Sequence, residues 1–147
     1  MIIGIGTDII DIRRIKNAIN RYGEKFKKRC FSNNEIIKSE NRFNTTNSYA
    51  KRYAAKEACS KALGTGITKE IFWKDIEVLN DKYGKPFIKL HNNALKRINK
   101  ITKKDYIIEV SLSDEKNYAI ANVIIYINDE KKDDYMEKFR QYYFIEE

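Results

Sequence analysis

Residues 48–64 read SYAKRYAAKEACSKALG, and this stretch decides the fold. It predicts a helix because it is rich in alanine and ends at Gly64, the residue type that most readily takes the left-handed conformation after a helix. Ala54, Ala58 and Ala62 recur at every fourth position, so they share one face of that helix. Small side chains on one face allow a helix to lie close against its neighbour. We therefore expect a long central helix packed against another element.

The flanking segments carry strand and helix patterns in turn. Pairs of strands joined by tight turns indicate antiparallel pairing, so the expected class is α+β, a small antiparallel sheet packed with the central helix. In chain order we expect a buried strand from Met1 to Thr7 that ends at Asp8, a helix from an Asp11 cap to Tyr22 and Gly23, a helix begun by the capping box Ser32–Glu35, strands 75–80 and 87–90, a helix from an Asn92 cap to about Ile101, and strands 106–113 and 118–126.

The length of 147 residues suits one compact domain, but the composition changes near the end of the chain. We expect one domain over residues 1–127 and a charged, aromatic extension over residues 128–147. Tyr135, Phe139 and Tyr142 fit one helical stripe, so the extension is either an amphipathic helix or a frayed tail.

The composition is that of a globular protein, with 42% hydrophobic and 34% charged residues. No apolar run approaches the roughly 20 residues that cross a bilayer, and the N-terminal residues lack the basic segment of a secretory signal, so a cytoplasmic location is expected. Cys30 and Cys59 lack the spacing of a metal or redox motif and are expected to be buried thiols. His91, the only histidine, is expected at the surface.

Positive charge is concentrated in the body of the chain. The residues from Asp129 onward include four basic and seven acidic side chains, so the net charge of +8 leaves the first 128 residues at +11. Eight of the basic residues lie between Arg13 and Arg29 beside one acid, Glu24. Such a body favours a polyanionic partner, which could be nucleic acid, an acidic protein or a phosphate-rich small molecule.

Two carboxylates stand on elements that are expected to be rigid: Asp8 at a strand end and Glu57 within the central helix. Taken alone, Glu57 is expected to pair at the surface with Lys61, four residues later on the same face. Two oxygen donors also suit Mg²⁺, which commonly takes one or two protein carboxylates together with phosphate oxygens. The loop Gly64-Thr65-Gly66 could bring backbone amides close to a phosphate, although it equally serves as a simple helix stop.

Five segments together resemble the bacterial-type holo-acyl-carrier-protein synthases, which are 4'-phosphopantetheinyl transferases. They occur in the family's order across residues 1–127, and the central segment is the most specific of them. The segments are GIGTDIIDIRRI, FSNNE, RYAAKEACSKALGTGI, WKDIEVLNDKYGKPFI and VSLSDEKNYAIANVII.

The resemblance implies transfer of the 4'-phosphopantetheine group from coenzyme A to a serine of apo-acyl carrier protein, in fatty acid biosynthesis. Asp8 matches the first Mg²⁺ ligand of the family and Glu57 the second, with the coenzyme A diphosphate completing the metal shell. Lys61 matches a catalytic lysine beside that diphosphate. The positions that match the coenzyme A site are Arg52, Lys56, Lys61, Gly64, Thr65, Gly84, Lys85, Pro86, Ser111 and Ser113.

The family forms homotrimers that bind coenzyme A between neighbouring subunits, so a trimer-forming 4'-phosphopantetheinyl transferase fold is expected. The carrier protein's acidic helix is expected to bind Arg14, Arg21, Lys25 and Phe26. One position departs from the family: many members read S-x-S-H where this chain has Ser111-Leu112-Ser113-Asp114. An acid at position 114 would repel the 3'-phosphate of coenzyme A. Lys116 or a basic residue of the region 41–56 is therefore expected to contact this phosphate instead.

Two features of the function stay open at this level. The general base that accepts the proton of the carrier serine is either Glu57 or a metal-bound water near Glu35. The basic body also fits a nucleic-acid-binding module without enzymatic activity, although no signature of such a module occurs. Asp114 is the one feature that favours a third alternative, a homologue that keeps the trimer but has lost activity. No nucleic-acid or membrane partner is expected for the transferase.

Overall fold

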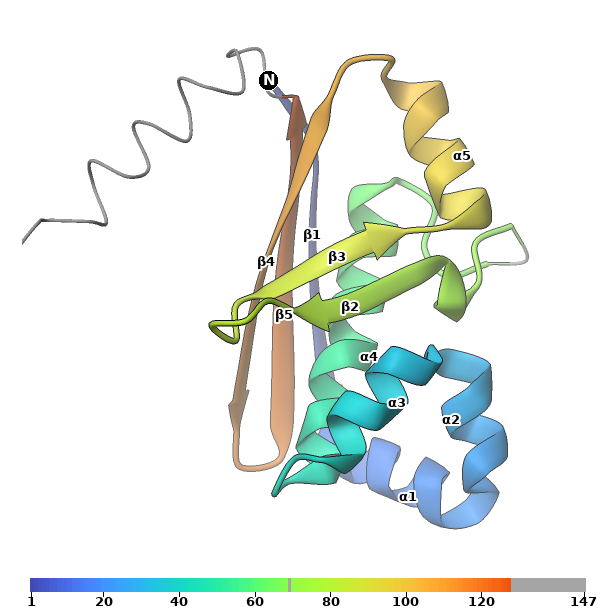
Figure 1. Cartoon of the computed structure of the whole chain (residues 1–147), viewed down its shortest axis with the longest axis vertical. Helices are drawn as coiled ribbons and strands as arrows, with labels where there is room; N and C mark the ends of the chain where they lie inside the picture. The colour runs from blue at the N-terminus through green and yellow to red at the C-terminus, as the bar shows by residue number, and fades with distance from the viewer. Residues whose placement is uncertain (69, 128–147) are drawn as a thin grey trace, which may run out of the picture.

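The computed structural model describes residues 1–68 and 70–127 (Figure 1). The extension over residues 128–147, including the stripe of Tyr135, Phe139 and Tyr142, lies outside the described residues. No helix among those described is long and apolar enough to cross a membrane.

A three-stranded antiparallel sheet forms one layer of the fold. It contains β1 (Ile2–Asp11), β4 (Tyr106–Glu115) and β5 (Tyr118–Ile127), in the order β1-β5-β4. Helix α4 (Thr45–Ala62) runs along one face of this sheet (Figure 1). The mixed α+β class with a central helix is therefore confirmed.

The approach between α4 and β1 is unusually close. A Cβ atom added at Gly6 would lie 1.8 Å from the carbonyl oxygen of Ala58, and one added at Gly4 would lie 2.0 Å from that of Ala62. Ala54 and Ala58 are fully buried at the same contact. The alanine stripe of the helix and the glycines of the strand therefore fit each other, as the sequence predicted from the helix side.

A two-stranded hairpin and four helices complete the domain. The hairpin crosses in front of the sheet, and α1 to α3 gather at one end of α4 while α5 lies toward the other (Figure 1). These elements are β2 (Ile76–Asn80), β3 (Pro86–Leu90), α1 (Ile12–Tyr22), α2 (Glu24–Cys30), α3 (Asn33–Glu40) and α5 (Asn92–Ile101), with a short 3-10 turn, η1 (Trp73–Asp75), before β2.

Several predicted helix boundaries are confirmed by their caps. Asp11 accepts from the backbone N–H of Arg13 at the start of α1, and Ser32 and Glu35 form a reciprocal capping box at the start of α3. Gly64 follows α4 with φ of 76°, the left-handed conformation expected after a helix.

Both cysteines are buried free thiols, as predicted. Burial raises the pKa of the Cys30 thiol to about 11 and that of the Cys59 thiol to about 12.

Four local predictions are wrong, on the end of β1, the burial of its residues, the cap of α5 and the exposure of His91. β1 extends to Asp11 because β5 pairs with it over the whole length, so Asp8 lies inside the strand rather than at its end. Ile5 and Ile9 are exposed, since they face away from α4. His91, not Asn92, is the residue before α5, and its ring is half-buried against Glu77 rather than at the surface.

Candidate active site

Asp8 and Lys61 form the first contact of the candidate site. Asp8 lies two residues after Gly6, on the face of β1 that α4 covers. The ammonium of Lys61 donates to Asp8 Oδ1 and to the carbonyl oxygen of Thr7, each at 2.9 Å. The predicted surface pair between Lys61 and Glu57 is therefore replaced by a pair with Asp8.

Glu57 lies one helical turn before Lys61 and close to the same carboxylate. Its pKa is raised, first by burial and then by the negative charge of Asp8, while Lys61 acts in the opposite direction. A carboxylate whose charged form is disfavoured by a neighbouring carboxylate is a natural site for a cation. Lys61 already supplies one positive charge there.

The oxygen donors of Asp8 and Glu57 fit Mg²⁺. Both are hard carboxylate ligands on rigid elements, a strand and a helix. The described residues hold no group of three or more acidic, histidine or cysteine side chains placed for a metal. Two carboxylates plus ligand oxygens therefore match the way proteins commonly hold this ion.

A cavity of about 480 Å³ lies on a different side of α4, toward the hairpin and β4. It combines cations, amides and a few apolar side chains. The residues that line it are Arg42, Phe43, Asn44, Asn47, Ser48, Lys51, Arg52, Val78, Asn80, Gly84, Pro86, Leu112 and Asp114.

Arg52 is the most deeply placed cation of this cavity, with 5% of its surface exposed. Its guanidinium donates to the hydroxyl of Ser48 at 2.7 Å and to the side-chain oxygen of Asn80 at 2.8 Å. It forms no ion pair with a carboxylate of the described residues, and its Nε has no hydrogen-bond partner among them. Burial lowers the pKa of Arg52. A buried cation in this state favours an anionic ligand.

The turn of the hairpin is held against the same cavity. Asn80 accepts from Arg52 and donates to the carbonyl oxygen of Gly84 at 3.0 Å. Gly84 and Pro86 line the cavity as a result. Lys85 instead pairs with Glu109 at 3.1 Å, and both side chains are exposed.

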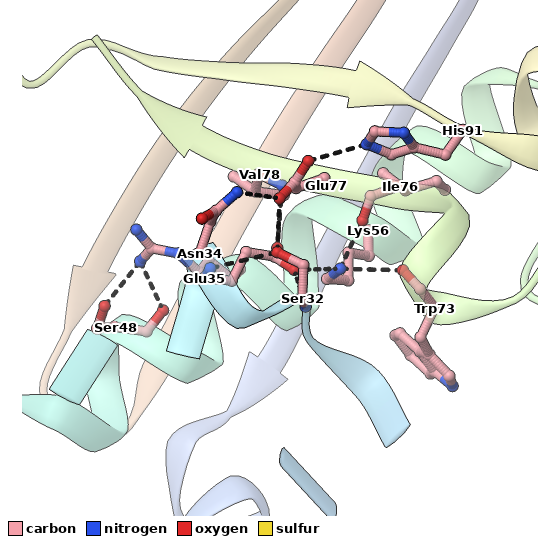
Figure 2. Close-up of polar contacts among 11 residues, drawn as sticks. Ser32, Asn34, Glu35, Ser48, Lys56, Trp73, Ile76, Glu77, Val78 and His91 are labelled. Atoms are coloured by element: carbon pink, nitrogen blue, oxygen red, sulfur yellow. Dashed lines mark hydrogen bonds and ion pairs between the residues drawn. The ribbon is translucent and has the colours of Figure 1, made fainter. Parts of the chain in front are cut away.

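Lys56 does not line the site, contrary to the prediction. Its side chain is fully buried, and its ammonium donates to Glu35 Oε2 and to the carbonyl oxygen of Trp73, both at 2.9 Å, and also to the carbonyl oxygen of Ile76 (Figure 2). Burial lowers the pKa of Lys56. The residue fastens α3, α4 and β2 together.

Glu35 is equally remote from solvent. Besides closing the capping box, it accepts from the backbone N–H of Val78 at 2.9 Å, and its side chain has no exposed surface (Figure 2). A metal-bound water near Glu35 is therefore excluded as a general base, because the carboxylate is enclosed and bonded on both oxygens.

Four further predicted residues lie away from both the cluster of Asp8, Glu57 and Lys61 and the cavity that Arg52 lines. Gly64 and Thr65 follow the end of α4 beside α5, and Thr65 lines a separate cavity with Arg97. Ser111 and Ser113 are exposed on β4 and alternate with Leu112 and Asp114, which face α4. Within one chain, these serines therefore lie on the uncovered face of the sheet.

The predicted carrier-protein residues lie on α1 and α2. Arg14, Arg21 and Lys25 are exposed, so they are available to an acidic partner. Phe26 is half-buried, stacking on Tyr53 with ring centroids 6.3 Å apart. It supports the helix as well as contributing to its surface.

Sequence reasoning nominated only a basic residue of the region 41–56 for phosphate binding and did not single out the cavity residues supplied by the segment before and at the start of α4. Arg42, Asn47 and Lys51 line the cavity with Asp114, which a helical pattern alone does not reveal. The spacing of Asn47 and Lys51, four residues apart on one helix face, was the available signal. Their common partner comes from β4, 67 residues beyond Asn47.

Comparison with known proteins agrees with this fold. A model of the 4'-phosphopantetheinyl transferase superfamily matches residues 4–123. The chain therefore belongs to this superfamily.

Individual relatives of the chain are named more specifically than the superfamily. The chain is 48% identical over 127 residues to the holo-[acyl-carrier-protein] synthase of Rhizobium meliloti (strain 1021), covering 86% of this chain and 91% of that protein. It resembles the crystal structure of holo-[acyl-carrier-protein] synthase from Neisseria meningitidis, with a TM-score of 0.75, 33% identity and coverage of 86% and 99%. The Helicobacter pylori enzyme in complex with coenzyme A gives a TM-score of 0.72 and 33% identity, covering 83% and 99% of the two chains.

Proposed function

We propose that this chain is a holo-acyl-carrier-protein synthase that transfers 4'-phosphopantetheine from coenzyme A to a serine of apo-acyl carrier protein, with Mg²⁺ as its cofactor. The observation that carries the proposal is the convergence of Asp8, Glu57 and Lys61 on one side of α4 in a chain of this superfamily. The relative from Helicobacter pylori was solved with coenzyme A, which supports this donor.

Asp8 and Glu57 would hold the metal. Bound there, Mg²⁺ would withdraw charge from the diphosphate oxygens of coenzyme A. The raised pKa of Glu57 fits this role, because a carboxylate crowded by another is relieved when a divalent cation lies between them.

In the proposed reaction, the serine hydroxyl oxygen of the carrier protein forms a bond to the β-phosphorus of coenzyme A. The bond from that phosphorus to the bridging oxygen breaks, and 3',5'-ADP leaves with the electron pair. Lys61, an exposed ammonium that can turn from Asp8 to a phosphate, would stabilise the charge of this leaving group.

The proton of the serine needs an acceptor. Since Glu35 is enclosed, Glu57 is the remaining candidate of the two considered.

The cavity of about 480 Å³ between α4, the hairpin and β4 would receive the nucleotide end of coenzyme A. Arg52, Gly84 and Pro86 line it, and the buried guanidinium of Arg52, whose Nε has no hydrogen-bond partner among the described residues, favours an anionic group there. Lys61 and Arg52 lie nine residues apart on α4, which is about 13 Å along the helix axis. One extended ligand can therefore meet both cations only if its phosphate groups are well separated.

A trimer would complete the site. Asp8 and Asp114 lie on β1 and β4, the two outer strands, so the carboxylate pair and the cavity open to different sides of α4. On the uncovered face of the sheet, Ile5 and Ile9 are 61% and 62% exposed. An apolar face of this kind is a candidate contact between copies, and a neighbouring copy could bring its cavity to the carboxylates.

The acidic helix of the carrier protein would bind the exposed cations Arg14, Arg21 and Lys25. The alternative of a nucleic-acid-binding module is not favoured, because the relatives described above are holo-[acyl-carrier-protein] synthases. The location in the cytoplasm and the division into residues 1–127 and 128–147 remain predictions.

The test is to incubate the protein with coenzyme A, Mg²⁺ and apo-acyl carrier protein and to weigh the carrier by mass spectrometry. The proposal predicts a mass gain of one phosphopantetheine that requires the metal. A carrier of unchanged mass under these conditions would refute it.

A further inference from the structure

A separate cluster of cations lies on α5, toward the end of α4 that is opposite to α1, α2 and α3 (Figure 1). Lys96, Arg97 and Lys100 line a cavity of about 370 Å³ together with a single carboxylate, that of Glu70. None of the three cations forms an ion pair with a carboxylate of the described residues. The cavity therefore has a surplus of two positive charges that no described side chain balances.

The positions of these cations favour an anionic partner. Arg97 is held against the end of α4, because its Nε donates to the carbonyl oxygen of Leu63 at 3.1 Å. Lys96 and Lys100 are exposed and lie four residues apart on one face of α5, where like charges repel each other. A negatively charged group placed between the two ammonium groups relieves this repulsion.

The C-terminal extension contains a segment of the opposite charge. Residues 129–137 read DEKKDDYME, with five acids and two bases. The match to the superfamily model ends at residue 123, so the segment lies beyond the part of the chain that the family describes. Its charge of −3 complements the surplus on α5.

The extension starts close to α5. It follows Ile127, whose N–H donates to the carbonyl oxygen of Met1 at 2.8 Å and which pairs with Tyr106 across the sheet. The six residues from Lys100 to Tyr106 span at most about 21 Å, and paired strand residues lie about 5 Å apart. The end of β5 thus lies at the same end of the molecule as the last turn of α5 (Figure 1). About eight extended residues are enough to bridge the gap.

The basic surface on α1 and α2 is too far away for most of these acids. Tyr126 pairs with Ile2, whereas α1 begins after Asp11, at the other end of β1. The strand between Ile2 and Asp11 is about 30 Å long at 3.3 Å per residue. Residues 129–134 reach at most about 24 Å from Ile127. In one chain they can therefore meet α5 but not α1.

We propose that the acidic segment 129–137 binds Lys96, Arg97 and Lys100 of its own chain. The contact lies outside the proposed active site and does not depend on transferase activity. A short tether gives the segment a roughly millimolar effective concentration, so surface ion pairs that are individually weak are sufficient. Because such pairs are screened by salt, the contact should weaken as the ionic strength rises.

Carbodiimide cross-linking of the full chain tests this contact, because the reagent joins a lysine ammonium to a carboxylate only when the two touch. Mass spectrometry should find Lys96 and Lys100 joined to acids of residues 129–137, with a yield that falls severalfold between low salt and about 0.5 M NaCl. Links from these acids to Lys16 or Lys25 in place of α5 would overturn the inference.

The same reaction on mixed isotope-labelled and unlabelled chains distinguishes the two possible origins of the segment. Binding within one chain predicts that each cross-link joins peptides of one label. Links between labelled and unlabelled peptides at the yield of random mixing would place the segment on another copy and would also overturn the inference.

A charge exchange tests the contact without a cross-link. Chymotrypsin cleaves after Tyr135, and binding of the segment to α5 should protect this bond. The variant Lys96→Glu/Lys100→Glu should therefore be cleaved severalfold faster than the unaltered protein. Adding Asp133→Lys/Asp134→Lys should restore most of the protection, because the two charges are then reversed together.

Two controls accompany the exchange. Asp133→Lys/Asp134→Lys alone measures how these residues affect the protease itself, and Lys82→Glu/Lys89→Glu changes two exposed lysines of the hairpin and should leave the cleavage rate unaltered. Thermal melting of each variant checks that the fold is intact. Equal cleavage rates in the unaltered protein and in the α5 variant, or no recovery in the exchanged variant, would overturn the inference.

Discussion

Lys56 and Glu35 form an ion pair that is fully enclosed by the protein, with 2.9 Å between the ammonium nitrogen and the carboxylate oxygen and no exposed surface on either side chain. The pair joins the middle of α4 to the first turn of α3. Both partners have further bonds, to the backbone of Trp73 and Ile76 on one side and to Val78 on the other (Figure 2). It is a structural centre, not a part of the catalytic group.

Breaking this pair should strongly destabilise the fold. Lys56→Met leaves the Glu35 carboxylate buried without its counter-charge, so we expect a loss of about 3–5 kcal/mol in the free energy of unfolding. Urea denaturation measures it. The double variant Lys56→Met/Glu35→Leu should lose less than the single variant, because no unpaired charge remains. A single variant within 1 kcal/mol of the unaltered protein would contradict the account.

The buried position of Lys56 shows why part of the site could not be predicted from the sequence. The lysine stands one residue before Glu57, and a helix turns by about 100° per residue, so neighbours in the chain face different surroundings. Which of them meets solvent depends on α3 and β2, which contact α4 from distant parts of the sequence. The helix itself, its alanine stripe and its glycine end were predictable because they depend on local spacing.

Contacts between α4 and strands that are distant in the sequence could not be fully predicted either. Asp8 and Glu57 could be nominated from residue type and resemblance, and the structure brings them together. Asp114 could be noticed as unusual, but its bond to Lys51 depends on the order β1-β5-β4, which places β4 beside the start of α4. The exposure of Ile5 and Ile9 likewise follows from which face α4 covers.

The contact between β1 and α4 should tolerate no side chain at Gly6. Gly6→Ala would place a Cβ 1.8 Å from the carbonyl oxygen of Ala58, so the strand and helix must separate, and we expect a loss of about 3 kcal/mol or more. Gly84→Ala is the matched control: its φ is 91° but no atom lies within 4 Å of the new Cβ. Backbone strain alone should cost it about 1–2 kcal/mol. Equal losses in the two variants, measured by urea denaturation, would argue against close packing.

Stability should fall in acid partly through Glu77. Burial raises the pKa of this carboxyl, but bonds from Ser32, His91 and Asn34 outweigh it, and the net pKa is lowered below the usual 4.5 (Figure 2). A lowered pKa in the folded state means that the carboxylate adds stability above pH 4.5, and that this stability is lost as the pH falls through the folded value. Glu77→Gln should therefore be less stable at pH 7 and lose less between pH 5 and 3 than the unaltered protein. Parallel pH profiles of the melting temperature would contradict this assignment.

The charge of Glu57 should affect stability in the opposite direction to that of Glu77. Its pKa is raised by burial and by Asp8, so the charged form costs stability at neutral pH, and Glu57→Gln should raise the melting temperature in metal-free buffer by a few degrees. The same variant should lose nearly all transfer activity, since it lacks the charge needed to hold the metal. A variant that melts earlier than the unaltered protein would mean that Glu57 has a stabilising partner instead.

The central claim is that Asp8 and Glu57 share one divalent cation. Calorimetric titration of Mg²⁺ into the protein saturated with coenzyme A tests it directly. We predict one ion per subunit in the unaltered protein, binding weakened at least tenfold in Asp8→Asn and in Glu57→Gln, and no change in Glu115→Gln, which alters an exposed acid on β4. Unchanged Mg²⁺ affinity in both site variants would contradict the account.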